Sequence, residues 1–179
     1  MKKDLKRLLF IGLAMVALSA CSKTEQRTPI ESIKFANEAF ANGDYKNAAV
    51  YAEETPDSIS SQLMLAKIYL SGNGIEKNDS IAAAWYAKAA QNGIAEAQSE
   101  LGKMYINAKG VARDYKEAAK WIKLAAEQNI AEAQYYMGWM YEEGVVFKKD
   151  KKSAVEWYRK AADGGNTAAM LKLPIKKKR

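Results

Sequence analysis

The 179-residue sequence contains no histidine, a single cysteine and only three prolines. Without histidine the chain cannot form a His-based catalytic triad, and it lacks the commonest protein ligand of transition metals. One cysteine excludes an intramolecular disulfide framework and a Cys-rich zinc site. We therefore expect no catalytic residues, no metal and no cofactor, which is more typical of a binding protein than of an enzyme.

Net positive charge is confined to the two ends of the chain. Residues 1–20 carry a net charge of +3 and residues 172–179 a net charge of +5, whereas residues 21–171 carry −1. The net charge of +7 therefore describes the termini and not a basic domain. A nucleic-acid-binding domain concentrates its basic residues on a folded face, so we expect no nucleic-acid partner.

Residues 1–20 have the organisation of an export signal. A basic segment at 2–7 precedes an apolar run of eleven residues at 8–18. A membrane-spanning helix needs about 20 residues to cross about 30 Å of hydrocarbon, so this run is too short to span. Its length is typical of the hydrophobic part of a secretory signal.

The apolar run leads into a short motif that contains the one cysteine, made up of Leu18, Ser19, Ala20 and Cys21. This motif resembles the lipobox of bacterial lipoprotein precursors. The resemblance implies recognition of the first three residues by the lipoprotein signal peptidase and attachment of diacylglycerol to Cys21, followed by a flexible tether at 21–30. A serine at position 22 is similar to the default for the outer membrane, which implies a lipid anchor on its periplasmic side. An ordinary cleaved signal with an incidental cysteine is the alternative.

The rest of the chain repeats itself every 36 residues. Residues 59–94, 95–130 and 131–166 align without a gap. The columns identical in all three copies are Tyr69/Tyr105/Tyr141, Ala82/Ala118/Ala154, Trp85/Trp121/Trp157, Ala89/Ala125/Ala161 and Ala90/Ala126/Ala162. Apolar residues recur at helical spacing on both sides of a polar, Gly-containing segment. Each copy is therefore predicted to form a helix, a loop of about seven residues, a second helix and a tight turn.

The helix ends are marked by residues that suit them. Asn78, Asp114 and Asp150 are predicted to cap the second helices, and Asp114 with Glu117 has the pattern of a capping box. Gly93, Asn129 and Gly165 are predicted to end these helices, since glycine and asparagine accept left-handed backbone geometry.

The segments that flank the three copies are predicted to close the stack. Residues 31–58 resemble a shorter, degenerate tetratricopeptide hairpin, with helices at 31–42 and 45–54. At the other end, 167–173 is predicted to form a capping helix that Pro174 interrupts, and a basic tail completes 167–179.

This organisation resembles the Sel1-like repeat family, a relative of the tetratricopeptide arrays, over residues 59–166. The resemblance implies an all-α fold, a right-handed α-solenoid of stacked helix–loop–helix repeats. One departure concerns the loop glycines, which are paired only at Gly72/Gly74; Ala108 and Val146 replace one member of the pair in the second and third copies. We expect these two loops to be differently shaped.

Departures from the repeat are the best candidates for a binding site, because residues needed for stacking recur with the period. Trp139 is out of phase, since Lys67 and Lys103 hold the equivalent positions. In tetratricopeptide-like arrays the first helices line the concave face, so the resemblance puts this tryptophan there. The candidate partner-binding residues are Tyr135, Tyr136, Trp139, Glu142 and Glu143. The alternative is that Trp139 closes the core of the last repeat against Leu171 and Leu173.

The leading hypothesis is a non-enzymatic, lipid-anchored periplasmic adaptor or inhibitor that binds another protein on its concave helical face. It would serve as an envelope scaffold or as an immunity protein against a secreted toxin. The alternative is an envelope-acting hydrolase or β-lactam-binding enzyme, like the disulfide-rich Sel1-repeat relatives, but this chain has no disulfide. Glu142 and Glu143 are adjacent on a helix and point about 100° apart, so they do not face one substrate. A third possibility is binding of membrane surfaces or anionic polymers through residues 176–179.

Overall fold

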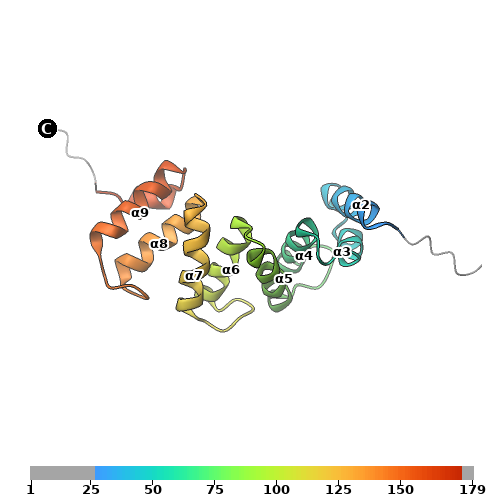
Figure 1. Ribbon diagram of the computed structural model, residues 1–179, viewed down its shortest axis with the longest axis horizontal. Helices are drawn as coiled ribbons and strands as arrows, with labels where there is room; N and C mark the ends of the chain where they lie inside the picture. Colours follow the sequence, from blue (N-terminus) through green and yellow to red (C-terminus); the bar gives the residue numbers. More distant parts are fainter. Residues whose placement is uncertain (1–26, 175–179) are drawn as a thin grey trace, which may run out of the picture.

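The computed structural model describes residues 27–174, and within this range the chain forms helices without any strand. Successive helices pair into hairpins, which stack side by side into an elongated right-handed α-solenoid (Figure 1). This confirms the predicted fold class. The helices are α2 (Pro29–Ala41), α3 (Tyr45–Glu53), α4 (Ile59–Ser71), α5 (Asp79–Gln91), α6 (Ala95–Asn107), α7 (Tyr115–Glu127), α8 (Ala131–Glu143), α9 (Lys151–Asp163) and α10 (Thr167–Lys172).

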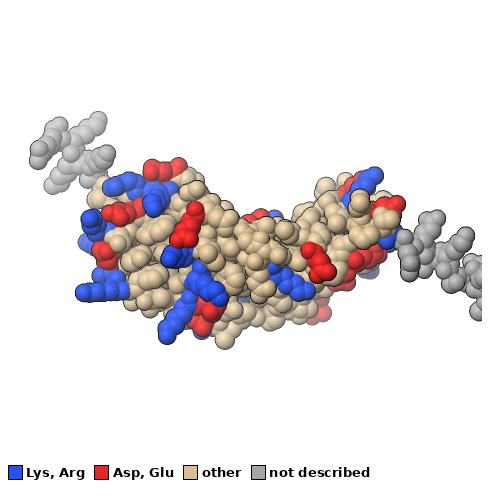
Figure 2. Space-filling view, in the orientation of Figure 1, with Lys and Arg blue, Asp and Glu red and all other residues tan. Residues whose placement is uncertain are grey.

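Each 36-residue copy holds one hairpin, in the order α4–α5, α6–α7 and α8–α9. The hairpin α2–α3 precedes them and the short helix α10 follows them, so α2 and α10 lie at opposite ends of the array (Figure 1). The space-filling view shows a bowed outline whose upper edge is hollowed over the middle of the array (Figure 2).

Helix α2 begins at Pro29, two residues before the predicted start, so the last two residues of the predicted tether at 21–30 are helical. Thr28 explains the difference. Its side chain accepts a hydrogen bond from the backbone N–H of Glu31, and its own backbone N–H donates to the Glu31 carboxylate at 2.8 Å. This capping box, with proline at the first helical position, fixes the start of the helix.

The predicted N-caps of the second helices are confirmed. Asn78, Asp114 and Asp150 each accept a hydrogen bond from a backbone N–H in the first turn of the helix that follows. Only the Asp114 half of the predicted capping box forms, because the Glu117 carboxylate turns to Lys120 at 3.5 Å instead.

The predicted helix ends also hold, since Gly93, Asn129 and Gly165 have φ angles of +83°, +65° and +88°. The second loop is not reshaped at Ala108 as expected: this residue takes φ +54°, the left-handed geometry of the glycines at its equivalent positions. The third loop does differ, because Val146 is not left-handed where Gly110 has φ +72°.

The interior of the array is rich in alanine, because helices that carry small side chains can approach closely. Gly102 and Gly138 allow a still closer approach of the paired helices. A Cβ on Gly138, for example, would lie 2.6 Å from the ring of Tyr158. Half-buried tryptophans pack between the repeats. The buried alanines are Ala36, Ala48, Ala49, Ala52, Ala66, Ala82, Ala83, Ala89, Ala90, Ala97, Ala118, Ala119, Ala125, Ala126, Ala133, Ala154, Ala161 and Ala169.

None of the helices between residues 27 and 174 has the length and apolar character needed to cross a membrane. The predicted export signal, the lipobox with Cys21 and the basic tail at 176–179 lie outside the described residues.

Candidate protein-binding face

A row of ion pairs joins the first helices of successive repeats. Lys67 on α4 reaches Glu96 in the first turn of α6, with 2.9 Å between Nζ and Oε1. One repeat later, Lys103 on α6 reaches Glu132 in the first turn of α8 at 2.8 Å. Lys103 also pairs with Glu100 at 2.7 Å, and its side chain is only 18% exposed. These contacts link α4 to α6 and α6 to α8, although most of the packing is between consecutive helices.

The ion-pair row ends at Trp139, which occupies the lysine position of α8. The residue 36 positions after Glu132 is Ala168 on α10, so the carboxylate that a lysine would need is missing as well. Both members of the pair change together. The surface at the end of the row is therefore aromatic where the earlier repeats are charged.

Trp139 is half-buried and packs back toward the second repeat. Its ring centroid lies 6.2 Å from that of Tyr115, the first residue of α7, with the ring planes tilted by 49°. Both aromatic rings pack against a buried cluster that includes Met137 and Met140, and Tyr136 packs against the same cluster.

The alternative in which Trp139 closes the last core against Leu171 and Leu173 is wrong. Leu173 packs on a separate cluster around Tyr158, and Leu171 is 88% exposed. Tyr135 takes the closing role instead, because it packs on that cluster.

The two tyrosines of α8 are adjacent in sequence but contact different parts of the molecule. Their ring centroids are 5.6 Å apart in an edge-to-face arrangement. Tyr135 faces α9, with its ring 5.5 Å from that of Tyr158. Tyr136 lies near the charged pair of Lys103 and Glu132, and burial, followed by the negative charge of Glu132, raises the pKa of its phenol. It therefore stays neutral and able to donate a hydrogen bond.

Glu142 ties the last helix to the array. Its carboxylate accepts hydrogen bonds from the Tyr158 hydroxyl at 2.6 Å and from Lys172 Nζ at 2.7 Å. The bond from Lys172, then that from Tyr158, lowers the pKa of Glu142, so the group is an ionised anchor rather than a proton donor. Glu143 is exposed and takes no part in this cluster.

The structure thus brings Trp139 and Tyr136 onto one cluster with Tyr115, and we call these three residues the aromatic face, whereas Tyr135 faces α9. The Glu142 carboxylate is bound by Lys172 of α10, and Glu143 is exposed to solvent. Sequence reasoning missed Tyr115, although a signal was present: Asp79 and Lys151 hold its equivalent positions, so it too is out of phase. Across residues 27–174, no group of acidic residues is placed to hold a metal ion.

Comparisons with known proteins agree with this architecture. The Sel1 repeat model matches residues 59–94, 95–130 and 131–166. A solved Sel1 repeat protein from Oxalobacter formigenes is 32% identical with a TM-score of 0.72, over 79% of this chain and 58% of that one. The protein c5321, a protective antigen of uropathogenic Escherichia coli with an SLR fold, is 31% identical with a TM-score of 0.78, over 83% of this chain and 33% of that one.

The chain therefore spans about a third to three fifths of the length of these two relatives. Cysteine rich protein B of Helicobacter pylori, at 22% identity and a TM-score of 0.54 over 79% of this chain and 96% of that one, shares the fold. A comparison with curated protein sequences gives no significant match. The matched repeats cover more than half of the sequence, and the chain belongs to the Sel1 repeat family, whose members are generally scaffolds for protein–protein interaction.

Proposed function

We propose that this chain is a lipid-anchored periplasmic adaptor or inhibitor that binds another protein through the aromatic face and carries out no reaction. An envelope scaffold and an immunity protein against a secreted toxin are the two forms this role would take. Cys21 would carry the lipid and place the array at the periplasmic side of the outer membrane. Family membership supports the general interaction role, since Sel1 repeats are typically non-catalytic modules.

The observation that carries the proposal is the replacement of the ion-pair row by Trp139. Stacking does not require a tryptophan there, because the same position holds lysine in the two preceding repeats. Half-buried Trp and Tyr side chains are the residue types that become binding hot spots, each contributing about 2 kcal/mol or more when a partner covers them. The neighbouring Lys67 and Lys103 keep the rest of this side polar, which suits a protein partner better than a lipid surface.

The test is crosslinking in the native envelope followed by mass spectrometry of the captured proteins. Trp139→Lys restores the residue of the other repeats and should reduce capture of the partner at least tenfold, which is the effect of losing one hot spot. Trp85→Lys is the matched control, because it removes a half-buried tryptophan that only stacks between repeats. Undiminished capture by Trp139→Lys, or an equal loss in Trp85→Lys, would contradict the proposed face.

The anchor is tested separately. Cys21→Ala should accumulate as an uncleaved precursor, because the peptidase of this pathway acts on the lipidated cysteine. Ser22→Asp is the companion variant and should move the processed protein from the outer to the inner membrane fraction. Normal processing of Cys21→Ala would refute the lipobox assignment without touching the binding proposal.

A further inference from the structure

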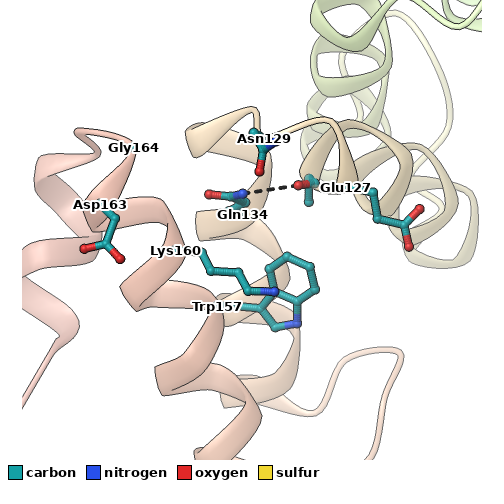
Figure 3. Close-up of a pocket in the computed structure, with 8 residues that line it drawn as sticks. Glu127, Asn129, Gln134, Trp157, Lys160, Asp163 and Gly164 are labelled. Atoms are coloured by element: carbon teal, nitrogen blue, oxygen red, sulfur yellow. Dashed lines mark hydrogen bonds between the residues drawn. The ribbon is translucent and has the colours of Figure 1, made fainter.

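A hollow of about 540 Å³ opens where α7 ends, α8 begins and α9 ends (Figure 3). Trp157 and Lys160 lie along one side of it, with the lysine Nζ 4.4 Å from the centroid of the indole. None of its residues belongs to the aromatic face. The residues that line it are Ala126, Glu127, Asn129, Gln134, Trp157, Lys160, Asp163 and Gly164.

The equivalent place in the earlier repeats is closed by a pair of side-chain amides. A glutamine in the first helix is buried in each repeat, and in the first two its amide oxygen accepts a hydrogen bond from the end of the second helix. Asn92 Nδ2 donates to Gln62 Oε1 at 3.1 Å, and Gln128 Nε2 donates to Gln98 Oε1 at 2.8 Å. The Gln128 amide also donates to the carbonyl oxygen of Gly93 at 3.1 Å, so both of its N–H groups are used.

The third repeat lacks this closing side chain, because Gly164 stands where Asn92 and Gln128 stand in the others. Gln134 keeps its own bond, from Nε2 to the Ala126 carbonyl at 3.2 Å. Its amide oxygen receives no hydrogen bond from any residue in the range 27–174, although the side chain is only 4% exposed. Figure 3 shows this oxygen turned away from the bonded nitrogen, toward Asp163 and Gly164 at the end of α9. Among the described residues the fully buried side-chain atoms without a partner are Asp79 Oδ1 and Ser99 Oγ, so the Gln134 oxygen borders the open hollow, where water or a ligand N–H can donate to it.

We propose that this hollow binds the side-chain carboxamide of an asparagine or glutamine from a partner polypeptide. The closed repeats define the chemistry, since the group that fills them is a carboxamide with two N–H donors. In the third repeat those donors would meet Gln134 Oε1 and the carbonyl of Asn129, the counterparts of Gln98 Oε1 and the Gly93 carbonyl. The methylene carbons of the bound side chain would lie against Trp157.

Charge around the hollow favours a neutral group over an acidic one. Asp163 lines the hollow with Lys160, whereas the Glu127 carboxylate points away from it and lies 3.8 Å from Lys123 Nζ (Figure 3). An aspartate or glutamate side chain would bring a carboxylate beside that of Asp163 and would offer no N–H donor to the Gln134 oxygen. The site does not depend on which protein covers the aromatic face.

The test uses the ¹⁵N-labelled full chain in detergent micelles and three small probes, the N-acetyl methylamides of glutamine, glutamate and arginine. The glutamine probe should shift the Gln134 amide and Trp157 indole resonances saturably, with a dissociation constant on the order of 1 mM. The glutamate probe should bind at least tenfold more weakly. Equal responses to glutamine and glutamate, tighter binding of arginine, or no response at all would each overturn the assignment.

Exchanging residues between repeats makes the test specific. Gln128→Gly should open a second hollow and add a second saturable response at Gln98 and Trp121. Gly164→Gln should close the existing hollow and abolish the response at Gln134. A Cβ at residue 164 would lie 2.8 Å from that of Ala131, so this variant requires a small shift of α9; Gln128→Gly needs none and decides the matter if Gly164→Gln does not fold. Absence of a second response in Gln128→Gly would contradict the proposal.

Discussion

Ala108 holds a backbone conformation that its side chain resists. It ends α6 with φ +54° and ψ +39°, whereas glycine ends α4 and α8 in the same left-handed geometry. This conformation costs an L-residue about 1–2 kcal/mol, while glycine costs about 0.5–1 kcal/mol in extra freedom of the unfolded chain. Ala108→Gly should therefore raise the free energy of unfolding by about 0.5–1 kcal/mol.

Gly144→Ala is the reciprocal change at the equivalent position and should lower the free energy of unfolding by at least as much. Its new Cβ would also approach the Cβ of Lys149 to 3.1 Å, which adds to the loss. The double variant with Ala108→Gly should lie at or slightly below the parent, since distant sites contribute additively.

Thermal unfolding followed by circular dichroism at 222 nm measures both changes. For a chain of this size 1 kcal/mol shifts the midpoint by about 2–4 °C, so Ala108→Gly should raise it by about 1–4 °C. A lower midpoint for Ala108→Gly would refute the reasoning, because the relief of left-handed strain would then be smaller than the cost of glycine's freedom.

Three further perturbations test other parts of the array. Gly110→Ala should lower the free energy of unfolding by about 3 kcal/mol in urea titrations, because its Cβ would meet the Asp79 carbonyl oxygen at 2.1 Å in addition to the left-handed strain; a loss below about 1 kcal/mol would contradict this contact. Asp114→Ala should cost about 1 kcal/mol by the same assay, since it removes the cap of α7, and an unchanged urea midpoint would argue against the cap. The pKa of Glu142 is lowered from 4.5 in the folded chain, so its stabilising effect is present above about pH 4.5 and is lost as pH falls toward the lower value. The protection of the α10 amides, taken as the ratio of intrinsic to measured hydrogen-exchange rates at each pH, should fall below pH 4.5 in the parent, whereas in Glu142→Gln it should already be low at neutral pH.

Much of the fold follows from residues that recur every 36 positions. The period sets the number of hairpins, and local chemistry sets their ends: Asp114 and Asp150 begin second helices because a carboxylate accepts backbone N–H groups there. Asn129 ends one because it tolerates left-handed geometry. Such features depend on a few neighbouring residues, so the sequence alone predicts them.

The candidate site is less predictable because it depends on contacts between repeats. Trp139 is visibly out of phase, yet nothing local shows that it turns toward Tyr115 instead of the last helix. Glu142 is another example, since its bonds to Tyr158 and Lys172 depend on where α10 docks. The sequence could have predicted the hollow beside Gly164 only through the alignment of the repeats, in which Gly164 takes the position of Asn92 and Gln128.

The alanine-rich interior makes the tolerance of this protein to mutation one-sided. At positions such as Ala89, Ala125 and Ala161 there is almost no side chain to remove, so truncation does little harm beyond the loss of helix propensity. Almost every single-residue change there adds atoms, and overfilled interiors lose about 1–3 kcal/mol through displaced helices. Sequence variation in such an array is therefore expected to collect on its outer surfaces, where a new side chain meets water or a new partner instead of a neighbouring helix.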